Sequence, residues 1–115
     1  MTLMKSNRAV AYYRSASAEE GNIQKQRDLV EDYANKHNLI IVQEFVDDGY
    51  SGLATEESLK KRKAFANLNE SIANTDCQCN HIIMRDISRI ARDLDFVEKT
   101  CRVWKKKGLE VIFVE

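Results

Sequence analysis

Hydrophobic residues in this chain alternate between short continuous runs and helically spaced stripes. Four short runs, rich in β-branched and aromatic residues, predict buried strands. The predicted strands cover residues 9–13, 39–42, 81–84 and 109–114, with His81 and Glu110 as polar members. Three segments between these runs repeat apolar residues every three or four positions, which predicts helices. They cover about residues 19–36, 61–73 and 93–107.

The three stripes also predict which helical side chains face the core. The expected members are Ile23, Val30, Tyr33, Ala34, Phe65, Leu68, Ile72, Leu94, Val97, Cys101 and Trp104. Gly108 follows the last stripe and predicts the end of that helix. Residues 47–52, Asp-Asp-Gly-Tyr-Ser-Gly, predict a loop that extends to about Leu59.

The alternation of strands and helices predicts a single α/β domain of 115 residues. Such a pattern forms a parallel sheet, with helices covering both faces of a doubly wound fold. Ligands of these folds bind at the carboxyl ends of the strands. We therefore expect the loops after Tyr13, Phe45 and Arg85 to meet at the functional edge.

Composition excludes several classes of protein. With 43% hydrophobic and 31% charged residues, the chain is neither disordered nor fibrous. No apolar run approaches the roughly 18 residues that span a membrane, so we expect no membrane partner. An odd count of three cysteines without a secretory signal predicts reduced thiols and a cytoplasmic location.

The net charge of zero hides an uneven distribution. Residues 58–107 carry twelve basic and six acidic side chains, whereas residues 19–57 carry three basic and ten acidic ones. A neutral protein with a basic half can still present one positive face to a polyanion. Solvated helix surface is the plainer interpretation of such charge runs.

Motifs for the common cofactors are missing. The chain has no Gly-x-Gly-x-x-Gly sequence and no phosphate loop that ends in Gly-Lys-Ser/Thr. His37 and His81 lack a ligand partner at helical spacing, and Cys77, Cys79 and His81 do not have the spacing of a standard zinc site. We therefore expect neither a metal ion nor a cofactor.

Arginine is the residue type with the most informative positions. Arg14 ends the first predicted strand, and Arg62 lies near the start of a helix. Arg89 and Arg92 follow the third strand, three residues apart. Guanidinium groups that converge at one edge of a sheet can bind phosphate through their planar forks. A hydroxyl beside such a cluster would be placed for phosphoryl transfer.

These residues belong to five motifs that resemble the catalytic domain of serine recombinases, the resolvase/invertase and large serine integrase family. The motifs are Tyr12-Tyr13-Arg14-Ser15-Ala16-Ser17, Ile23-x-x-Gln26, Asp47-Asp48-Gly49-Tyr50-Ser51-Gly52, Arg62 before Phe65, and Asp86-Ile87-Ser88-Arg89-Ile90-Ala91-Arg92-Asp93. Each motif alone is weak, but their order and spacing together are specific. The resemblance covers about residues 8–115.

The resemblance implies a resolvase-like fold with a mostly parallel sheet of four or five strands. It also implies site-specific recombination of double-stranded DNA. A serine hydroxyl attacks the scissile phosphate, a 5′-phosphoserine link forms, and a 3′-hydroxyl leaves. Strands are exchanged within a tetramer and rejoined by the reverse step, without metal or nucleotide.

By motif match, the resemblance also assigns roles to individual residues. The arginines that would bind the phosphate and stabilise the transition state are Arg14, Arg62, Arg89 and Arg92. Gln26 and Asp47 match polar positions that support the site.

The position of the nucleophile departs from the family pattern. The family has Arg-x-Ser, but the residue two positions after Arg14 is Ala16. One extra residue would move the nucleophile to Ser17, which lies nine positions before Gln26, close to the family interval. Alternatively, the nucleophile was lost at Ala16, or Ser15 takes its role. Ser17 also fits as the cap of the following helix.

Two further departures concern the arginine motif and the length of the chain. Many relatives have arginine where this chain has Asp86. The chain also ends before the dimerisation helix and DNA-binding region of the family. We therefore expect a fragment of a longer bacterial, phage or mobile-element recombinase, inactive in recombination when alone and self-associating as a dimer or tetramer in its parent.

Two rival interpretations remain. One is a recombinase-like module without catalysis, which serves assembly or regulation. The other is a doubly wound regulatory domain unrelated to recombination, because Asp47 and Asp48 after a strand resemble the acidic pocket of receiver domains.

Overall fold

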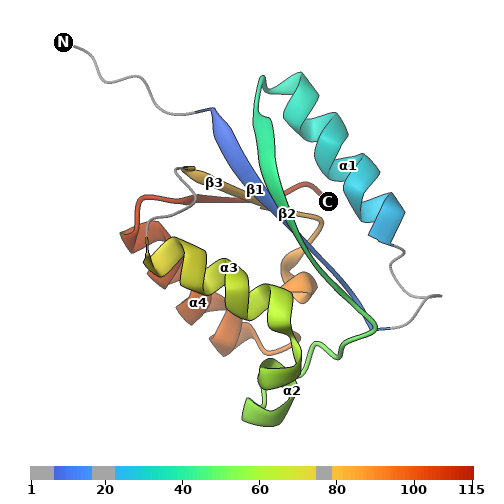
Figure 1. Ribbon diagram of the computed structural model, residues 1–115, viewed down its shortest axis with the longest axis vertical. Coiled ribbons are helices and arrows are strands. Elements are labelled where there is room, and N and C mark those ends of the chain that lie inside the picture. Colours follow the sequence, from blue (N-terminus) through green and yellow to red (C-terminus); the bar gives the residue numbers. More distant parts are fainter. Residues whose placement is uncertain (1–6, 17–22, 75–78) are drawn as a thin grey trace.

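The computed structural model describes residues 7–16, 23–74 and 79–115 of the chain. Within these residues, four parallel strands form one sheet in the order β2-β1-β3-β4 (Figure 1). The strands are β1 (Arg8–Ser15), β2 (Ile40–Asp48), β3 (His81–Met84) and β4 (Glu110–Phe113). The predicted α/β class, parallel sheet and strand order along the chain are confirmed.

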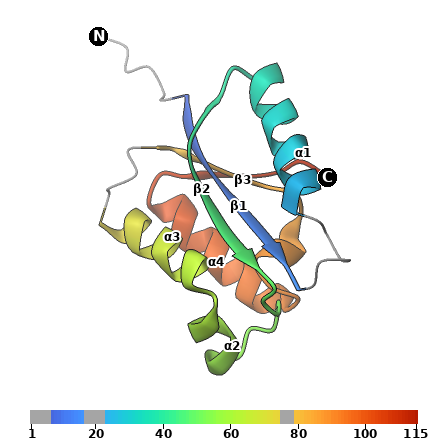
Figure 2. The same ribbon diagram turned by 45° about the vertical axis from the view of Figure 1, so that its right-hand side comes forward.

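Helices cover both faces of the sheet, as predicted. The longer helices are α1 (Ile23–Lys36), α3 (Lys63–Ala73) and α4 (Leu94–Lys106), and the short ones are α2 (Glu56–Lys61) and the 3₁₀ turn η1 (Ile87–Arg89). Helix α1 lies on one face, while α3 and α4 lie side by side on the other (Figures 1 and 2).

Strand β1 runs through the middle of the fold and is buried on both faces. Its alternating side chains enter two separate cores. Val10 and Tyr12 join the core under α3 and α4, and Ala9, Ala11 and Tyr13 join the core under α1. All five have no exposed surface, which explains why the segment is continuously apolar.

The helical stripes are largely confirmed as core positions. Phe65, Leu68 and Ile72 are buried on α3, and Val97 and Trp104 are buried on α4. The prediction is wrong for one residue on α4. Leu94, a member of the predicted stripe, is 63% exposed, because it is the first residue of the helix.

The segment between β2 and α3 differs from the prediction of a loop followed by one helix. Residues 56–61 form the separate helix α2, whose N-cap Thr55 accepts a hydrogen bond from the amide of Ser58. Ion pairs four residues apart, Glu56–Lys60 and Glu57–Lys61, support it.

Arg62 separates α2 from α3. It has a non-helical backbone with φ −85° and ψ 78° and serves as the boundary residue of both helices. The break turns the Arg62 side chain inward, where it has no exposed surface. The irregular backbone thus delivers a charged side chain from a helical segment into the interior.

Candidate active site

Three loops meet at the carboxyl ends of the parallel strands, as the strand pattern predicts. The Ser15 carbonyl at the end of β1 accepts hydrogen bonds from the amides of Gly49 at 2.6 Å and Tyr50 at 3.0 Å. The loop after β2 is therefore fastened to the end of β1. The loop after β3 joins them through the side chain of Arg14.

The Arg14 guanidinium ties the three loops together. Its nitrogens donate to the carbonyls of Tyr50 at 2.9 Å, Ser88 at 2.6 Å and Arg89 at 3.1 Å. The residue is only 2% exposed. A Cβ atom at Gly52 would lie 2.6 Å from Arg14 Nη2, so this position accommodates only glycine while Arg14 keeps its place.

Arg62 enters the same site from the junction of α2 and α3. It donates to the hydroxyl of Tyr12 at 3.0 Å and to the Arg89 carbonyl at 2.9 Å, and it lies over the ring of Phe65. Its Nη1 is buried and has no hydrogen-bond partner within the described part of the chain. The charge of Arg62 is therefore held by neutral groups.

Arg89 completes the group from the 3₁₀ turn after β3. Its Nη1 donates to the Arg14 carbonyl at 2.5 Å and its Nη2 to Ser88 Oγ at 2.9 Å. Its Nε lies 3.3 Å from a carboxylate oxygen of Asp86. The Arg89 carbonyl accepts from both other arginines, which makes this residue the link between them.

The three arginines form a buried cationic cluster, which we call the arginine site: Arg14, Arg62 and Arg89. Burial, followed by the charges of Arg89 and Arg62, lowers the pKa of Arg14 to about 10, so Arg14 remains charged at neutral pH. Cations that repel one another at close range favour a bound anion. The arrangement is therefore suited to a phosphate group.

Gln26 and Asp47 hold the frame of this site. The Gln26 amide bonds both the N–H of Arg14 at 3.2 Å and its carbonyl at 2.9 Å, so α1 grips the end of β1. Asp47 accepts from the amides of Ala64 and Phe65 and caps the start of α3. Both predicted supporting residues thus lie beside the arginines.

The fourth predicted arginine lies outside the buried cluster. Arg92 is exposed, and its backbone amide donates to the carbonyl of Gly52 at 3.0 Å. Its side chain lines a shallow depression with Leu53 and Thr55. The structure therefore brings three of the four arginines together and leaves Arg92 at the surface next to them.

The candidate nucleophiles differ in accessibility. Ser15 is 1% exposed, and Ala16 is half-buried and carries no hydroxyl. Ser17 lies outside the described residues.

Sequence reasoning missed three contributors to the site. The Tyr12 hydroxyl donates to Asp47 at 2.7 Å and accepts from Arg62, and its pKa is raised chiefly by burial. Ser88 supplies both a hydroxyl and a carbonyl to the arginines. Gly52 has no side chain, which leaves room for the Arg14 guanidinium. The sequence signal for this residue was its position in the loop motif at residues 47–52.

The described residues contain no group of three or more His, Cys, Asp or Glu side chains that could hold a metal ion. No helix within them is long and apolar enough to cross a membrane. Cys79 is disulfide-bonded and Cys101 is free. The expected reduced state is therefore wrong for Cys79.

The solved structures that this chain resembles include catalytic domains of recombinases. The N-terminal catalytic domain of TP901-1 integrase has a TM-score of 0.78 at 24% identity, over 93% of this chain and 77% of that one. A resolvase family site-specific recombinase from Streptococcus pneumoniae has the same TM-score and identity, over 93% and 71%. The C-terminal catalytic domain of ISC1926 TnpA, an IS607-like serine recombinase, has 0.77 at 21%, over 94% and 67%.

These likenesses define the fold as that of serine recombinase catalytic domains. The model of the resolvase N-terminal domain matches residues 9–115, and the chain therefore belongs to that family. No curated protein matches the chain. Membership contradicts the rival interpretation of a doubly wound domain unrelated to recombination.

Proposed function

We propose that residues 1–115 are the catalytic domain of a site-specific recombinase that cleaves DNA through a serine hydroxyl. The observation that carries the proposal is the convergence of three arginine side chains. Arg14 and Arg62 both donate a hydrogen bond to the backbone carbonyl of Arg89. Three buried cations at the carboxyl edge of a parallel sheet suit an anionic ligand. The DNA phosphate is the anion on which serine recombinases act.

In the proposed reaction, the Ser17 hydroxyl attacks the phosphorus of one DNA strand. A bond forms between Oγ and phosphorus, and the bond from phosphorus to the 3′ oxygen breaks. The serine proton is lost to the surrounding water, and the leaving 3′ oxygen takes up a proton to become a free hydroxyl. The 5′-phosphoserine link preserves the energy of the phosphodiester, so the reverse attack rejoins strands without a cofactor.

The arginines stabilise the charge that builds up on the phosphoryl oxygens. Charge stabilisation and positioning account for most of the catalysis of phosphoryl transfer. Arg89 is 8% exposed and provides the phosphate contact from the cluster, while Arg14 holds the three loops in register. Arg92, at the surface beside them, adds a contact to the DNA backbone.

Ser17 is the proposed nucleophile among three candidates. The burial of Ser15 argues against a hydroxyl that must meet a DNA strand. Ala16 has no hydroxyl. The spacing of nine positions from Ser17 to Gln26 supports Ser17, because Gln26 grips the backbone of Arg14 and fixes where the segment after β1 departs.

An activated phosphodiester tests this chemistry without knowledge of the DNA site. The p-nitrophenyl ester of thymidine 5′-phosphate carries p-nitrophenolate in place of the 3′ oxygen. Attack by the serine releases p-nitrophenolate and leaves a thymidine 5′-phosphoryl group on the protein. We expect intact-mass analysis to detect this group, and peptide mapping to locate it on Ser17.

Ser17→Ala is the decisive variant, and Ser15→Ala is its matched control. We expect Ser17→Ala to abolish the adduct and Ser15→Ala to retain it. A longer polypeptide that contains this chain is assayed in parallel on duplex DNA, since strand exchange is expected to need a self-associated dimer or tetramer. Equal labelling of the Ser17→Ala variant would refute the proposed nucleophile.

The second candidate function is a recombinase-like module without catalysis. Two observations favour it: Ala16 stands where the family pattern has serine, and Asp86 stands where many relatives have arginine. This alternative predicts no adduct from either polypeptide, together with DNA binding that persists in the Ser17→Ala variant.

A further inference from the structure

We propose that Asp86 acts as an internal substitute for the DNA phosphate. It holds Arg89 until a phosphate of the DNA backbone replaces it, so its charge sets the affinity of the arginine site for DNA. The inference rests on the proposed function for its ligand. It adds a residue that controls binding without touching the reacting atoms.

The geometry around Asp86 resembles the way a phosphate is bound. One carboxylate oxygen accepts hydrogen bonds from the Ser88 amide at 3.0 Å, from the Ser88 hydroxyl, and from Arg89 Nε at 3.3 Å. A backbone amide, a hydroxyl and a guanidinium are the donors that proteins use for phosphate oxygens. An anion thus already occupies one face of Arg89.

This carboxylate is distinctive among the partners of the arginine site. Within the part of the chain that the structure describes, Asp86 is the only acidic side chain that bonds directly to one of the three arginines. Arg14 and Arg62 donate to carbonyl and hydroxyl oxygens. Asp47 is nearby, but its oxygens are used by α3 and Tyr12.

The contact is placed where an incoming anion can displace it. The side chain of Asp86 is 30% exposed, whereas that of Arg89 is 10% exposed. Burial opposes the charge of Asp86, but hydrogen bonds from Ser88 and the charge of Arg89 lower its pKa below the ordinary value. The carboxylate is therefore ionised at neutral pH and competes with DNA for Arg89.

The Asp86→Asn variant isolates the charge from the fold. Asparagine is as good an N-cap as aspartate and can still accept from the Ser88 amide at the start of the 3₁₀ turn. We expect this variant to bind a fluorescein-labelled duplex of mixed sequence about three- to five-fold more tightly at low salt, since one part-exposed charge contact changes binding by that order. Fluorescence anisotropy measures the change.

Two controls separate a local effect from a change in net charge. Asp93→Asn makes the same substitution at the N-cap of α4, beside Arg92, and is expected to change affinity less than about two-fold. In an Arg89→Gln background, Asp86→Asn is expected to give no gain. The proposal is overturned if Asp86→Asn binds no more tightly than Asp93→Asn, or if its gain persists without Arg89.

The outcome is independent of cleavage, because the binding assay is repeated in the Ser17→Ala variant. Tighter binding by Asp86→Asn without any serine adduct would refute the proposed chemistry and support this inference. A serine adduct together with unchanged DNA binding by Asp86→Asn would support the proposed chemistry and refute this inference. If neither the wild-type protein nor the Asp86→Asn variant binds the duplex, the inference is refuted. Asp86→Ser, also a capping residue without charge, replaces Asp86→Asn if the latter fails to fold.

Discussion

Two adjacent tyrosines of β1 show how one set of side chains serves different purposes on opposite faces of the sheet. Tyr12 donates its hydroxyl to Asp47 at 2.7 Å, and Tyr13 donates to Glu44 at 2.8 Å. Both carboxylates belong to β2, and burial raises the pKa of both phenols. An arginine accompanies each pair: Arg62 with Tyr12 and Arg27 with Tyr13.

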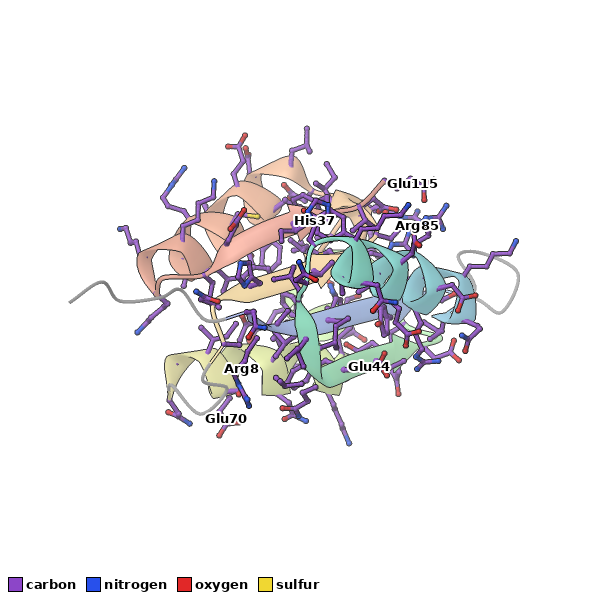
Figure 3. All side chains as sticks on the ribbon, turned by 90° about the horizontal axis from the view of Figure 1, so that it is seen from above. Arg8, His37, Glu44, Glu70, Arg85 and Glu115 are labelled. Atoms are coloured by element: carbon purple, nitrogen blue, oxygen red, sulfur yellow. The ribbon has the colours of Figure 1, made fainter. Side chains whose placement is uncertain are left out.

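The two groups of tyrosine, carboxylate and arginine differ in which atoms accept the hydrogen bonds of the arginine. Arg27 bonds Glu44 directly at 3.0 Å and cancels its charge, near the surface where Figure 3 labels Glu44 on β2. Arg62 donates to the Tyr12 hydroxyl and a carbonyl instead, because Asp47 already caps α3.

One face therefore has a neutral clamp, which fastens α1 to β2. The other face keeps an uncancelled cation in its interior. A fold retains such a cation at a cost in stability where an anion is to be bound. The difference between the faces supports a ligand-binding role for the arginine site and a structural role for the Arg27 pair.

The largest expected effect comes from removing Arg62, with the removal of Arg27 as its matched control. Arg62→Ala leaves the Arg89 carbonyl with one donor fewer and opens space beside Phe65, so we expect a loss of about 3 kcal/mol of unfolding free energy. Arg27→Ala removes a part-exposed pair and should cost less than about 1 kcal/mol. Urea unfolding followed by circular dichroism measures both.

Arg62→Met sharpens this result, because it keeps most of the side-chain volume and removes the charge. If packing dominates, Arg62→Met recovers most of the stability and remains unable to bind DNA as tightly as the wild-type protein. Equal losses for Arg62→Ala and Arg27→Ala would mean that the two faces do not differ as argued.

The fold was largely predictable because its signals are local. A strand buried on both faces must be continuously apolar, and residues 9–13 and 82–84 are. The helical stripe of α3 likewise identified Phe65, Leu68 and Ile72. The short helix α2 was missed although Thr55 and its charge pairs were visible, because the acidic loop before it suggested that the loop continued.

The sequence predicted which residues form the arginine site, but it did not predict their hydrogen-bond partners. Motif resemblance selected Arg14, Arg62 and Arg89, and parallel-strand topology indicated that their loops meet. That Arg14 donates only to backbone carbonyls depends on how three loops fold against one another, and no sequence period encodes it. The pairing of Asp86 with Arg89 is local in sequence, at a spacing of three, and could have been expected.

Gly52→Ala should have the next largest effect and act only on the face of the arginine site. The added Cβ would lie 2.6 Å from Arg14 Nη2 and 2.9 Å from its Cζ, so the guanidinium must leave at least one of its three carbonyls. We expect a loss of about 1 to 2 kcal/mol in urea unfolding, together with weaker binding of duplex DNA.

Leu53→Ala is the matched control for this change. It lies next to Gly52 in the same loop, is 53% exposed, and should change stability by less than about 0.5 kcal/mol. If Gly52→Ala and Leu53→Ala unfolded at the same urea concentration, the close approach of residue 52 to Arg14 would not affect stability as predicted.

The smallest expected effect is a pH dependence carried by Asp86. Because the pKa of this carboxyl is lowered in the folded protein, its contribution to stability is fully present above its unfolded pKa and is lost as the pH falls through the folded value. With the side chain 30% exposed, the contribution should be about 0.5 kcal/mol.

Urea unfolding at several pH values from about 6 down to about 3 measures this contribution as the difference between the wild-type protein and Asp86→Asn. Contributions from groups that do not interact with Asp86 cancel in that difference. We expect the wild-type advantage to shrink toward zero at the acid end of the range. A difference that stays constant with pH would mean that the charge of Asp86 does not stabilise the turn, and that Arg89 is held by its bonds to Arg14 and Ser88 alone.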